Sequence, residues 1–230
     1  MFSGSFCFLE RLKAIFHESY SQMQTVLVAT QKGGSGKSTL VAHLGVTASQ
    51  SGERVALIDT DPQGSLAGWG ARREADTPLV AATTLLGLPE ALEAARSDGM
   101  TLAIVDTPGS FGAAEANAIA EADFILIPAR PSPFDLSAIA KTLDAVRAIR
   151  RPAAIVLTQC RPVGTEAAEM RAALADVGVE VLPETIGVRV AFVVAITGGL
   201  AVTEFERHDS PAVVEIRALY AALKGRLNGQ

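Results

Sequence analysis

Residues 31–39 read Gln31-Lys32-Gly33-Gly34-Ser35-Gly36-Lys37-Ser38-Thr39, and this stretch decides the fold of the chain. It follows a short apolar run at 26–30 and opens a segment of helical periodicity at 37–50. Glycines let consecutive backbone N–H groups curl around phosphate oxygens without Cβ clashes, and the positive end of the following helix points at the same anion. The sequence therefore predicts a phosphate-binding loop between a strand and a helix.

Two side chains of this loop have expected tasks of their own. Lys37 would reach the β and γ phosphates of a nucleotide, and the Ser38 hydroxyl would bind Mg²⁺. By composition, Gly-Gly-x-Gly-Lys-Ser/Thr arises by accident in such a chain on the order of once in a thousand sequences. A merely flexible glycine loop is therefore a poor alternative. The expected nucleotide-binding residues of the loop are Gly33, Gly34, Ser35, Gly36, Lys37, Ser38 and Thr39.

Further apolar runs follow the loop, and segments of helical periodicity separate them. The runs are rich in Val, Ile and Leu without strict alternation, as expected for strands buried on both faces. This order predicts a doubly wound, mainly parallel sheet with helices on both faces. The expected strands are 26–30, 55–59, 102–106, 124–128, 153–158 and 179–182. The expected helices are 37–50, 88–97, 113–121, 136–150, 166–177 and 211–227.

Two aspartate-containing turns end the expected strands 55–59 and 102–106. The first reads Asp-Thr-Asp-Pro-Gln from Asp59, and the second reads Asp-Thr-Pro-Gly from Asp106. An aspartate that ends a strand and starts a turn is common by itself. Here both lie at carboxyl ends of strands, where an open α/β sheet collects its ligands. Since Mg²⁺ takes one or two carboxylates as support, Asp106 is expected to hold a magnesium-bound water, with Asp59 in the same shell.

Composition excludes several other classes of protein. Apolar residues make up 49% and charged residues 20% of the chain, which is typical of a packed globular protein and not of a disordered one. The two cysteines, Cys7 and Cys160, lack metal-ligand or redox spacing, which fits a reducing cytosol. A formal net charge of −5 argues against an extensive basic surface, so any nucleic-acid contact should be a local patch in the last third.

Residues 23–230 are expected to form a single domain, since this length suits one α/β core. Residues 1–22 stand apart as an N-terminal extension, either a start-site artefact or a dispensable arm that could form a short amphipathic helix. No apolar run approaches the roughly 20 residues needed to span a bilayer, and the start lacks the apolar centre of a secretory signal. The helical stripe at 211–227 favours a helix docked on the core.

The start of the phosphate loop departs from the common pattern. Gln31 stands where that pattern has Gly, and a second lysine, Lys32, follows it. In this the sequence resembles the deviant Walker A family, which includes ParA, MinD and the nitrogenase iron protein. In that family the signature lysine crosses a dimer interface and contacts the nucleotide of the other subunit. The resemblance implies that ATP joins two subunits of a homodimer and that Mg²⁺-dependent hydrolysis to ADP and phosphate needs both.

Other stretches resemble the small ParA-type partition ATPases within this family. They are the Asp-Thr-Asp-Pro-Gln turn with Trp69 just beyond it, the segments 128–136 and 181–183, and the segment 187–192. The resemblance covers nearly the whole chain. It implies that Lys32 and Lys37 are catalytic, that Asp61 orients the attacking water, and that Gln159 and Pro183 lie near the adenine.

Relatives with other functions fit less well. The nitrogenase iron protein needs paired cysteines, which this chain lacks. MinD-type proteins use a basic amphipathic tail on membranes, which the segment 211–227 resembles poorly, so no membrane partner is expected. Large plasmid ParA proteins carry an N-terminal helix-turn-helix domain, for which too little chain precedes the loop. Two alternatives stay open: a MinD-like membrane-positioning ATPase, and a metabolic ligase of the dethiobiotin-synthetase type, which needs no signature lysine.

The resemblance to the small ParA ATPases implies a nucleoid-associated, cytoplasmic ATPase whose ATP dimer binds DNA nonspecifically and is released by a ParB-like partner protein. Such binding requires Arg or Lys side chains that neutralise DNA phosphates. For each such residue singly, a solvated surface charge is the commoner role. The sequence leaves open whether the cargo is a plasmid, a chromosome, a carboxysome or a chemotaxis cluster. The candidate DNA contacts are Arg189, Arg217, Lys224 and Arg226, with Arg207 and Arg171 behind them.

Overall fold

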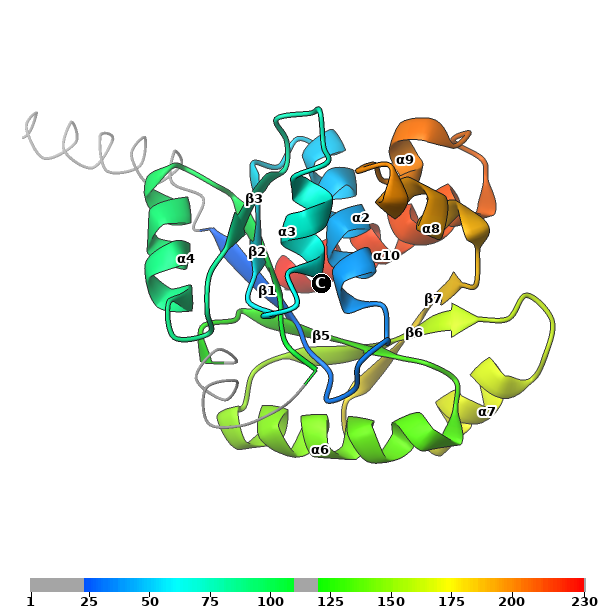
Figure 1. Ribbon diagram of the computed structural model, residues 1–230. Helices are drawn as coiled ribbons and strands as arrows, with labels where there is room; N and C mark the ends of the chain where they lie inside the picture. The colour runs from blue at the N-terminus through cyan, green and yellow to red at the C-terminus, as the bar shows by residue number, and fades with distance from the viewer. Residues whose placement is uncertain (1–22, 110–119, 230) are drawn as a thin grey trace, which may run out of the picture.

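A computed structural model describes residues 23–109 and 120–229, which are built around a seven-stranded sheet (Figure 1). The strand order is β3-β2-β4-β1-β5-β6-β7, and every neighbouring pair is parallel. This confirms the predicted mainly parallel sheet. The strands are β1 (Gln24–Val28), β2 (Val55–Asp59), β3 (Leu79–Ala82), β4 (Leu102–Asp106), β5 (Phe124–Ala129), β6 (Ala153–Cys160) and β7 (Glu180–Gly187).

Helices cover both faces of the sheet, as the doubly wound topology requires (Figure 1). One face packs against α2 (Lys37–Gln50), α3 (Ser65–Gly70), α8 (Val190–Thr197), α9 (Val202–Phe205) and α10 (Pro211–Leu227). The other face packs against α4 (Leu88–Ser97), α6 (Pro133–Ile149) and α7 (Glu166–Ala173). Burial of the central strands on both faces explains their continuous apolar sequences. No helix of the described segments has the length and apolarity that a membrane crossing requires.

Four described elements were not predicted from the sequence. The edge strand β3 has only four residues, most of them exposed, and therefore lacks a buried apolar run. Helices α3 and α9 are short, and α8 is apolar on both its buried and its exposed sides, so none shows helical periodicity. The predicted strand 179–182 was too short, because β7 continues through Pro183 to Gly187.

Proline is tolerated in β7 because this strand lies at the edge of the sheet, where one row of backbone groups has no partner strand. The predicted helices 136–150 and 166–177 correspond to α6 and α7 with shifted ends. Most of the predicted helix 113–121, and the whole extension 1–22, lie outside the described residues.

The strand order places the site. On one side of β1 the chain places β2, then β3 at the edge, and returns to insert β4 between β2 and β1; on the other side it adds β5, β6 and β7 in order. Such a reversal of direction opens a crevice at the carboxyl ends of the strands. In the parallel register Asp59 pairs with Asp106 on the neighbouring strand, and Asp106 pairs with Val28 at the end of β1. Both carboxylates therefore lie beside the loop that follows β1.

His43 on α2 gives the fold a pH dependence. Its ring is 1% exposed, its Nδ1 accepts a hydrogen bond from the Val202 N–H (3.2 Å), and it packs edge-on against Phe192. Burial lowers the pKa of His43 to about 4, and the nearby Phe192 carbonyl and Glu204 carboxylate only partly offset this. Because the folded pKa lies below the unfolded value, the unfolded chain binds more protons between pH 6.5 and 4. The contribution to stability is complete above that window and is lost as the pH falls through it.

We expect this group to remove about 3 kcal/mol of unfolding free energy between pH 6.5 and 4. The measurement is urea denaturation across that range for the wild type and for His43→Asn, whose amide oxygen can keep the bond from Val202. The stability of the variant should fall less steeply as the pH is lowered. Equal slopes for the two proteins would contradict the assignment.

Candidate active site

The loop from β1 to α2 has the shape that its glycines permit. Gly34 and Gly36 have φ values of 73° and 86°, in the left-handed region that side chains rarely adopt. Gly36 is the N-cap of α2, and its carbonyl accepts the first helical bond, from Leu40 N–H (2.8 Å). The amino end of α2 therefore points into the loop, as predicted for a phosphate-binding loop.

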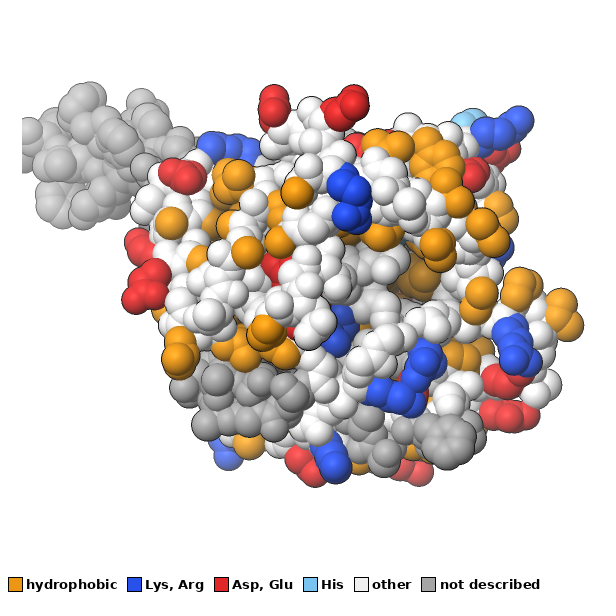
Figure 2. All heavy atoms as spheres, viewed as in Figure 1, with side chains coloured by type: hydrophobic (Ala, Val, Ile, Leu, Met, Phe, Trp, Pro, Cys, Tyr) orange, Lys and Arg blue, Asp and Glu red, His pale blue; other side chains and the backbone are white. Residues whose placement is uncertain are grey.

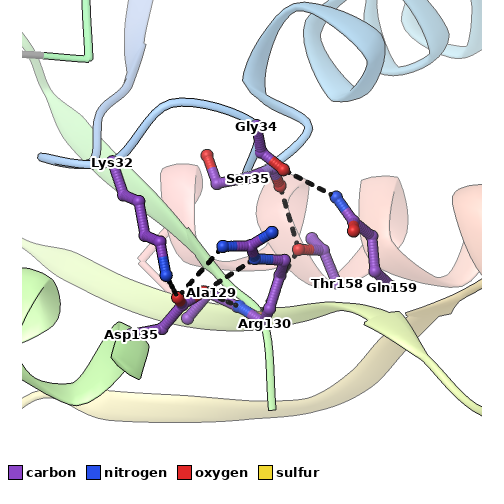
Figure 3. A network of polar contacts seen from close by, with 8 residues as sticks. All are labelled: Lys32, Gly34, Ser35, Ala129, Arg130, Asp135, Thr158 and Gln159. Atoms are coloured by element: carbon purple, nitrogen blue, oxygen red, sulfur yellow. Dashed lines mark hydrogen bonds and ion pairs between the residues drawn. The ribbon is translucent and has the colours of Figure 1, made fainter. Parts of the chain in front are cut away.

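The carboxyl end of β6 supports this loop from the side (Figure 3). The Thr158 hydroxyl donates to the Ser35 carbonyl (3.0 Å), and the Gln159 side-chain amide donates to the Gly34 carbonyl (2.9 Å). Gln159 reaches the loop from a left-handed backbone conformation, with φ 54°, which is uncommon for a residue with a Cβ. The carbonyls of Gly34 and Ser35 thus have hydrogen-bond donors from β6, and the N–H groups of the loop stay available to an anion.

Lys37 and Asp106 are buried charged groups beside the phosphate loop, close enough to influence each other's pKa. Lys37 is 7% exposed and Asp106 is fully buried. Burial lowers the pKa of Lys37, although the charges of Asp106 and Asp61 oppose this. Burial also raises the pKa of Asp106, to about 7, and the neighbouring Asp59 adds to the effect while Lys37 counteracts it. Burial therefore disfavours the charged form of both side chains, and a bound group of opposite charge would stabilise each of them.

The residues present fit a magnesium ion. Neither carboxylate oxygen of Asp106 has a hydrogen-bond partner among the described residues. The Ser38 hydroxyl lies close enough to lower the pKa of Asp106, but its geometry falls outside that of a hydrogen bond. A buried carboxylate without partners is costly unless a cation or a donor satisfies it, and Mg²⁺ prefers carboxylate, hydroxyl and water oxygens. Ser38 and Asp106 therefore remain the best ligands for the predicted metal.

The other two predicted carboxylates organise the turn after β2. Asp59 accepts hydrogen bonds from the backbone N–H of Asp61 (3.0 Å) and of Ala67 in α3 (2.8 Å). Asp61 accepts from the N–H of Gln63 (3.0 Å) and stays partly exposed. Asp59 thus fixes the turn, which is consistent with an indirect role at the metal, while Asp61 faces an open space.

That space is a cleft of about 450 Å³ between the phosphate loop and α3. Its lining includes Lys37, Ser38, Asp61 and the loop glycines, so the structure brings these predicted residues together. The loop after β4 closes it, because Gly109 lies so close that an added Cβ would come within 3.2 Å of the Gly33 nitrogen. A residue larger than glycine at 109 would therefore push the phosphate loop.

A second cavity of about 340 Å³ adjoins the first across the amino end of α2. It is mostly apolar and is lined by Thr39, Gln159, Gly187 and Phe192 among others. The cavity lies beside the phosphate loop and includes Gln159, whose proximity to the adenine stays a prediction. Pro183 lines neither cavity; it is an exposed residue of β7 whose carbonyl accepts a bond from Arg171 (2.8 Å). Its proximity to the adenine remains a prediction.

The signature lysine has partners that the sequence did not indicate. The ammonium group of Lys32 forms an ion pair with Asp135, in the first turn of α6. Asp135 also binds Arg130, at the end of β5, through two side-chain contacts of 3.0 and 3.2 Å and the Arg130 N–H (3.2 Å) (Figure 3). Burial alone would raise the pKa of Asp135, but the contacts with Arg130 and Lys32 outweigh it and lower the pKa.

The candidate DNA contacts do not form one patch in the subunit. Arg189 lies at the second cavity and pairs with Glu215 (3.0 Å). Arg217 and Lys224 line a groove of about 610 Å³ near the carboxyl end of α2, about 20 Å from the phosphate loop at 1.5 Å per helical residue.

Most of these cations already have an acidic or carbonyl partner. Lys224 pairs with Glu53 (2.6 Å) and Arg226 with Glu180 (2.8 Å). Among the secondary candidates, Arg207 pairs with Asp209 (3.1 Å). Arg171 donates to the backbone carbonyls of Leu182 and Pro183 in β7. Arg217 forms no ion pair within the described residues and is the freest of the set.

Comparisons with known proteins place the chain in a family of nucleotide-binding proteins. The family model of the CobQ/CobB/MinD/ParA nucleotide binding domain matches residues 26–201. The chain is 31% identical over 203 residues to the maintenance of carboxysome distribution protein A of Halothiobacillus neapolitanus, covering 85% of this chain and 94% of that protein. It is 32% identical over 180 residues to protein ParA of Rhizobium radiobacter, covering 74% and 81% of the two chains.

Among solved structures, a Cyanothece McdA–ATP complex superposes with a TM-score of 0.70 at 19% identity. The match covers 91% of this chain and 97% of that one. At this identity the likeness concerns the fold alone, and the two chains share that fold over nearly their full lengths.

Proposed function

This chain belongs to the CobQ/CobB/MinD/ParA nucleotide-binding family as a ParA-type member, and from that premise we propose that it is an ATP-driven switch that positions a cargo on DNA. Two subunits would enclose ATP, the closed homodimer would hold DNA without sequence preference, and a ParB-like partner protein would stimulate hydrolysis and release. The working place of such a switch is the nucleoid, within the cytoplasm.

The observation that carries the proposal is that the two lysines of the phosphate loop lie in different surroundings. Lys37 is 7% exposed and lies inside the cleft, where it can serve the nucleotide of its own subunit. The Lys32 side chain is 30% exposed, pairs with Asp135 and does not line the cleft. A cation at that position can serve a nucleotide outside its own subunit, as an arginine finger does.

Within one subunit the proposed roles follow the geometry. The loop N–H groups and Lys37 would bind the phosphates. Ser38 and Asp106 would hold Mg²⁺ with Asp59 behind them, and the metal would neutralise charge on the β and γ phosphate oxygens. Asp61 lies on the cleft with one carboxylate oxygen that accepts no hydrogen bond from the described residues, so it would orient the attacking water.

The surface around the site suits a second subunit. Helix α8 runs between the two cavities, since Val193 lines one and Ile196 the other. Its outward side exposes Val190 (78%), Val193 (67%) and Val194 (53%), and hydrophobic side chains gather over α8 and α9 on this face (Figure 2). Contiguous apolar surface of this kind commonly marks a protein interface. A dimer closed around the nucleotide would cover it.

The names of the relatives support positioning as the biological task. One relative is named for carboxysome distribution and another is a ParA. The two names differ in what is positioned, so the proposal concerns the cycle of ATP-dependent assembly and release and leaves the cargo open among plasmid, chromosome and other large assemblies.

The proposal is tested by DNA retention with ATP, with ADP and without nucleotide, each at two salt concentrations. We expect retention only with ATP, and weaker retention at the higher salt, because phosphate contacts release counterions. Equal retention in all three states, or none in any, would end the proposal. Sedimentation with anionic liposomes in ATP would instead favour a membrane-positioning ATPase.

We propose Arg217 as a DNA contact, because its side chain is exposed and forms no ion pair within the described residues. In a dimer the two copies would each neutralise one phosphate, so Arg217→Ala should weaken DNA binding and reduce the slope of log affinity against log salt by about 2. The measurement is a titration of a labelled duplex with the ATP-bound protein at several salt concentrations. Arg96→Ala, on α4 across the sheet, is the matched control. An unchanged slope for Arg217→Ala would remove this residue from the interface.

A further inference from the structure

We propose that Asp135 stores the ammonium group of Lys32 within its own subunit, and that Arg130 becomes the sole counter-ion of Asp135 when Lys32 turns to the nucleotide of the partner subunit. Asp135 and Arg130 are thus positioning residues for the signature lysine. The inference rests on the proposed function. It adds how Asp135 holds the lysine before dimerisation and how Arg130 allows its release.

The storage half of the inference rests on where the ion pair lies. Asp135 is 2% exposed at the start of α6, and Lys32 reaches it across 103 residues of sequence. Figure 3 shows the lysine side chain extended down from the phosphate loop toward this carboxylate. In the isolated subunit the ammonium group is therefore committed to a neighbour of its own chain.

The release half rests on the second cation. Removing one partner from a buried ion pair is strongly unfavourable, because it leaves an uncompensated charge. Asp135 avoids that state, since Arg130 holds both of its oxygens: Nε contacts Oδ2 at 3.0 Å and Nη2 contacts Oδ1 at 3.2 Å. The Arg130 N–H adds a third contact to Oδ2 at 3.2 Å. A departing lysine therefore leaves behind a carboxylate that still has a bidentate partner.

The lysine itself can leave. It precedes Gly33 and Gly34, two exposed glycines that place no side chain in its way and have open space where a Cβ would stand. Its side chain is 30% exposed and ends in a point charge on a flexible four-carbon stem. Arg130, by contrast, is fixed by its planar fork on Asp135. The two cations are suited to different tasks, one to move and one to stay.

The test is a double-mutant cycle on ATP turnover, with the dependence on ATP and on protein concentration measured for each variant. Arg130→Gln removes the remaining counter-ion, so Lys32 is held more tightly. We expect kcat to fall about tenfold while KM for ATP changes less than about twofold. Adding Asp135→Asn to this variant removes the charge that holds the lysine, and turnover should return to within about threefold of the wild type.

If Arg130 and Asp135 had only a structural role, adding Asp135→Asn would not restore turnover. The double variant would then turn over ATP no faster than Arg130→Gln alone. Arg161→Gln, which breaks an exposed ion pair with Glu166, is the matched control and should leave turnover unchanged. If a thermal melt shows that Arg130→Gln is poorly folded, Arg130→Lys replaces it, because it keeps the charge but loses the two-pronged contact with Asp135. The turnover of Arg130→Lys should be lower than that of the wild type.

The outcomes separate this inference from the proposed function. Unchanged turnover in Arg130→Gln, or no recovery in the double variant, would overturn the storage of Lys32 by Asp135 while leaving the ATPase intact. A wild type without ATP turnover, or full turnover in Lys32→Ala, would instead overturn the proposed function on which the inference rests.

Discussion

Lys32→Ala should lower the ATP turnover of this protein by at least about 100-fold, while ATP binding stays within about threefold of the wild type. The loop N–H groups and Lys37, which bind the phosphates within the subunit, are untouched by the substitution. What is lost is a cation that meets the charge developing on the transferred phosphoryl group, and such a loss affects kcat more than binding.

The measurement is steady-state hydrolysis together with equilibrium binding of ATP by the same preparations. Lys141→Ala, which removes an exposed lysine of α6, controls for the loss of one positive charge. Full turnover in Lys32→Ala would remove the signature-lysine mechanism and would favour an enzyme complete in one subunit, such as a metabolic ligase.

Asp61→Ala should abolish most hydrolysis, by about 100-fold or more, and should leave an ATP-bound dimer that persists through gel filtration. Asp61 faces the cleft, forms no ion pair with Lys37 among the described residues, and supports the turn by one bond, from the Gln63 N–H, whereas Asp59 accepts two. Binding of nucleotide and Mg²⁺ through Ser38 and Asp106 should therefore survive.

Asp61→Asn separates charge from turn geometry in this experiment. Its amide oxygen can still accept the bond from the Gln63 N–H, so the turn is kept while the negative charge is lost. If the carboxylate orients the water, Asp61→Asn should be nearly as slow as Asp61→Ala. Rapid hydrolysis in either variant would show that another group orients the water.

The sequence predicted the central fold because the deciding features are local. The glycines of the loop, the apolar strands and the Asp59 and Asp106 turns each lie within a few residues, and parallel register then aligns them at one edge of the sheet. The burial of Lys37 against Asp106 follows from the same alignment. These parts of the site could be placed from spacing and strand order alone.

The parts that could not be predicted depend on contacts between distant segments. Asp135, the ion-pair partner of Lys32, lies 103 residues away, and an aspartate in the first turn of a helix is by itself an ordinary feature. Helix α8 carries no periodicity because it is apolar on all sides, which reads as neither strand nor amphipathic helix. The ion pairs that occupy Arg189, Lys224 and Arg226 likewise involve acidic residues from other elements.

The central claim is that each active site takes Lys37 and Asp61 from one subunit and Lys32 from the other. It is tested most directly by mixing Lys32→Ala and Asp61→Ala proteins in equal amounts before adding ATP and Mg²⁺. Random pairing makes about half of the dimers mixed, and each mixed dimer has one complete site out of two. The account predicts turnover near one quarter of the wild type from two proteins that are each nearly inactive. No turnover beyond the sum of the separate variants would contradict it.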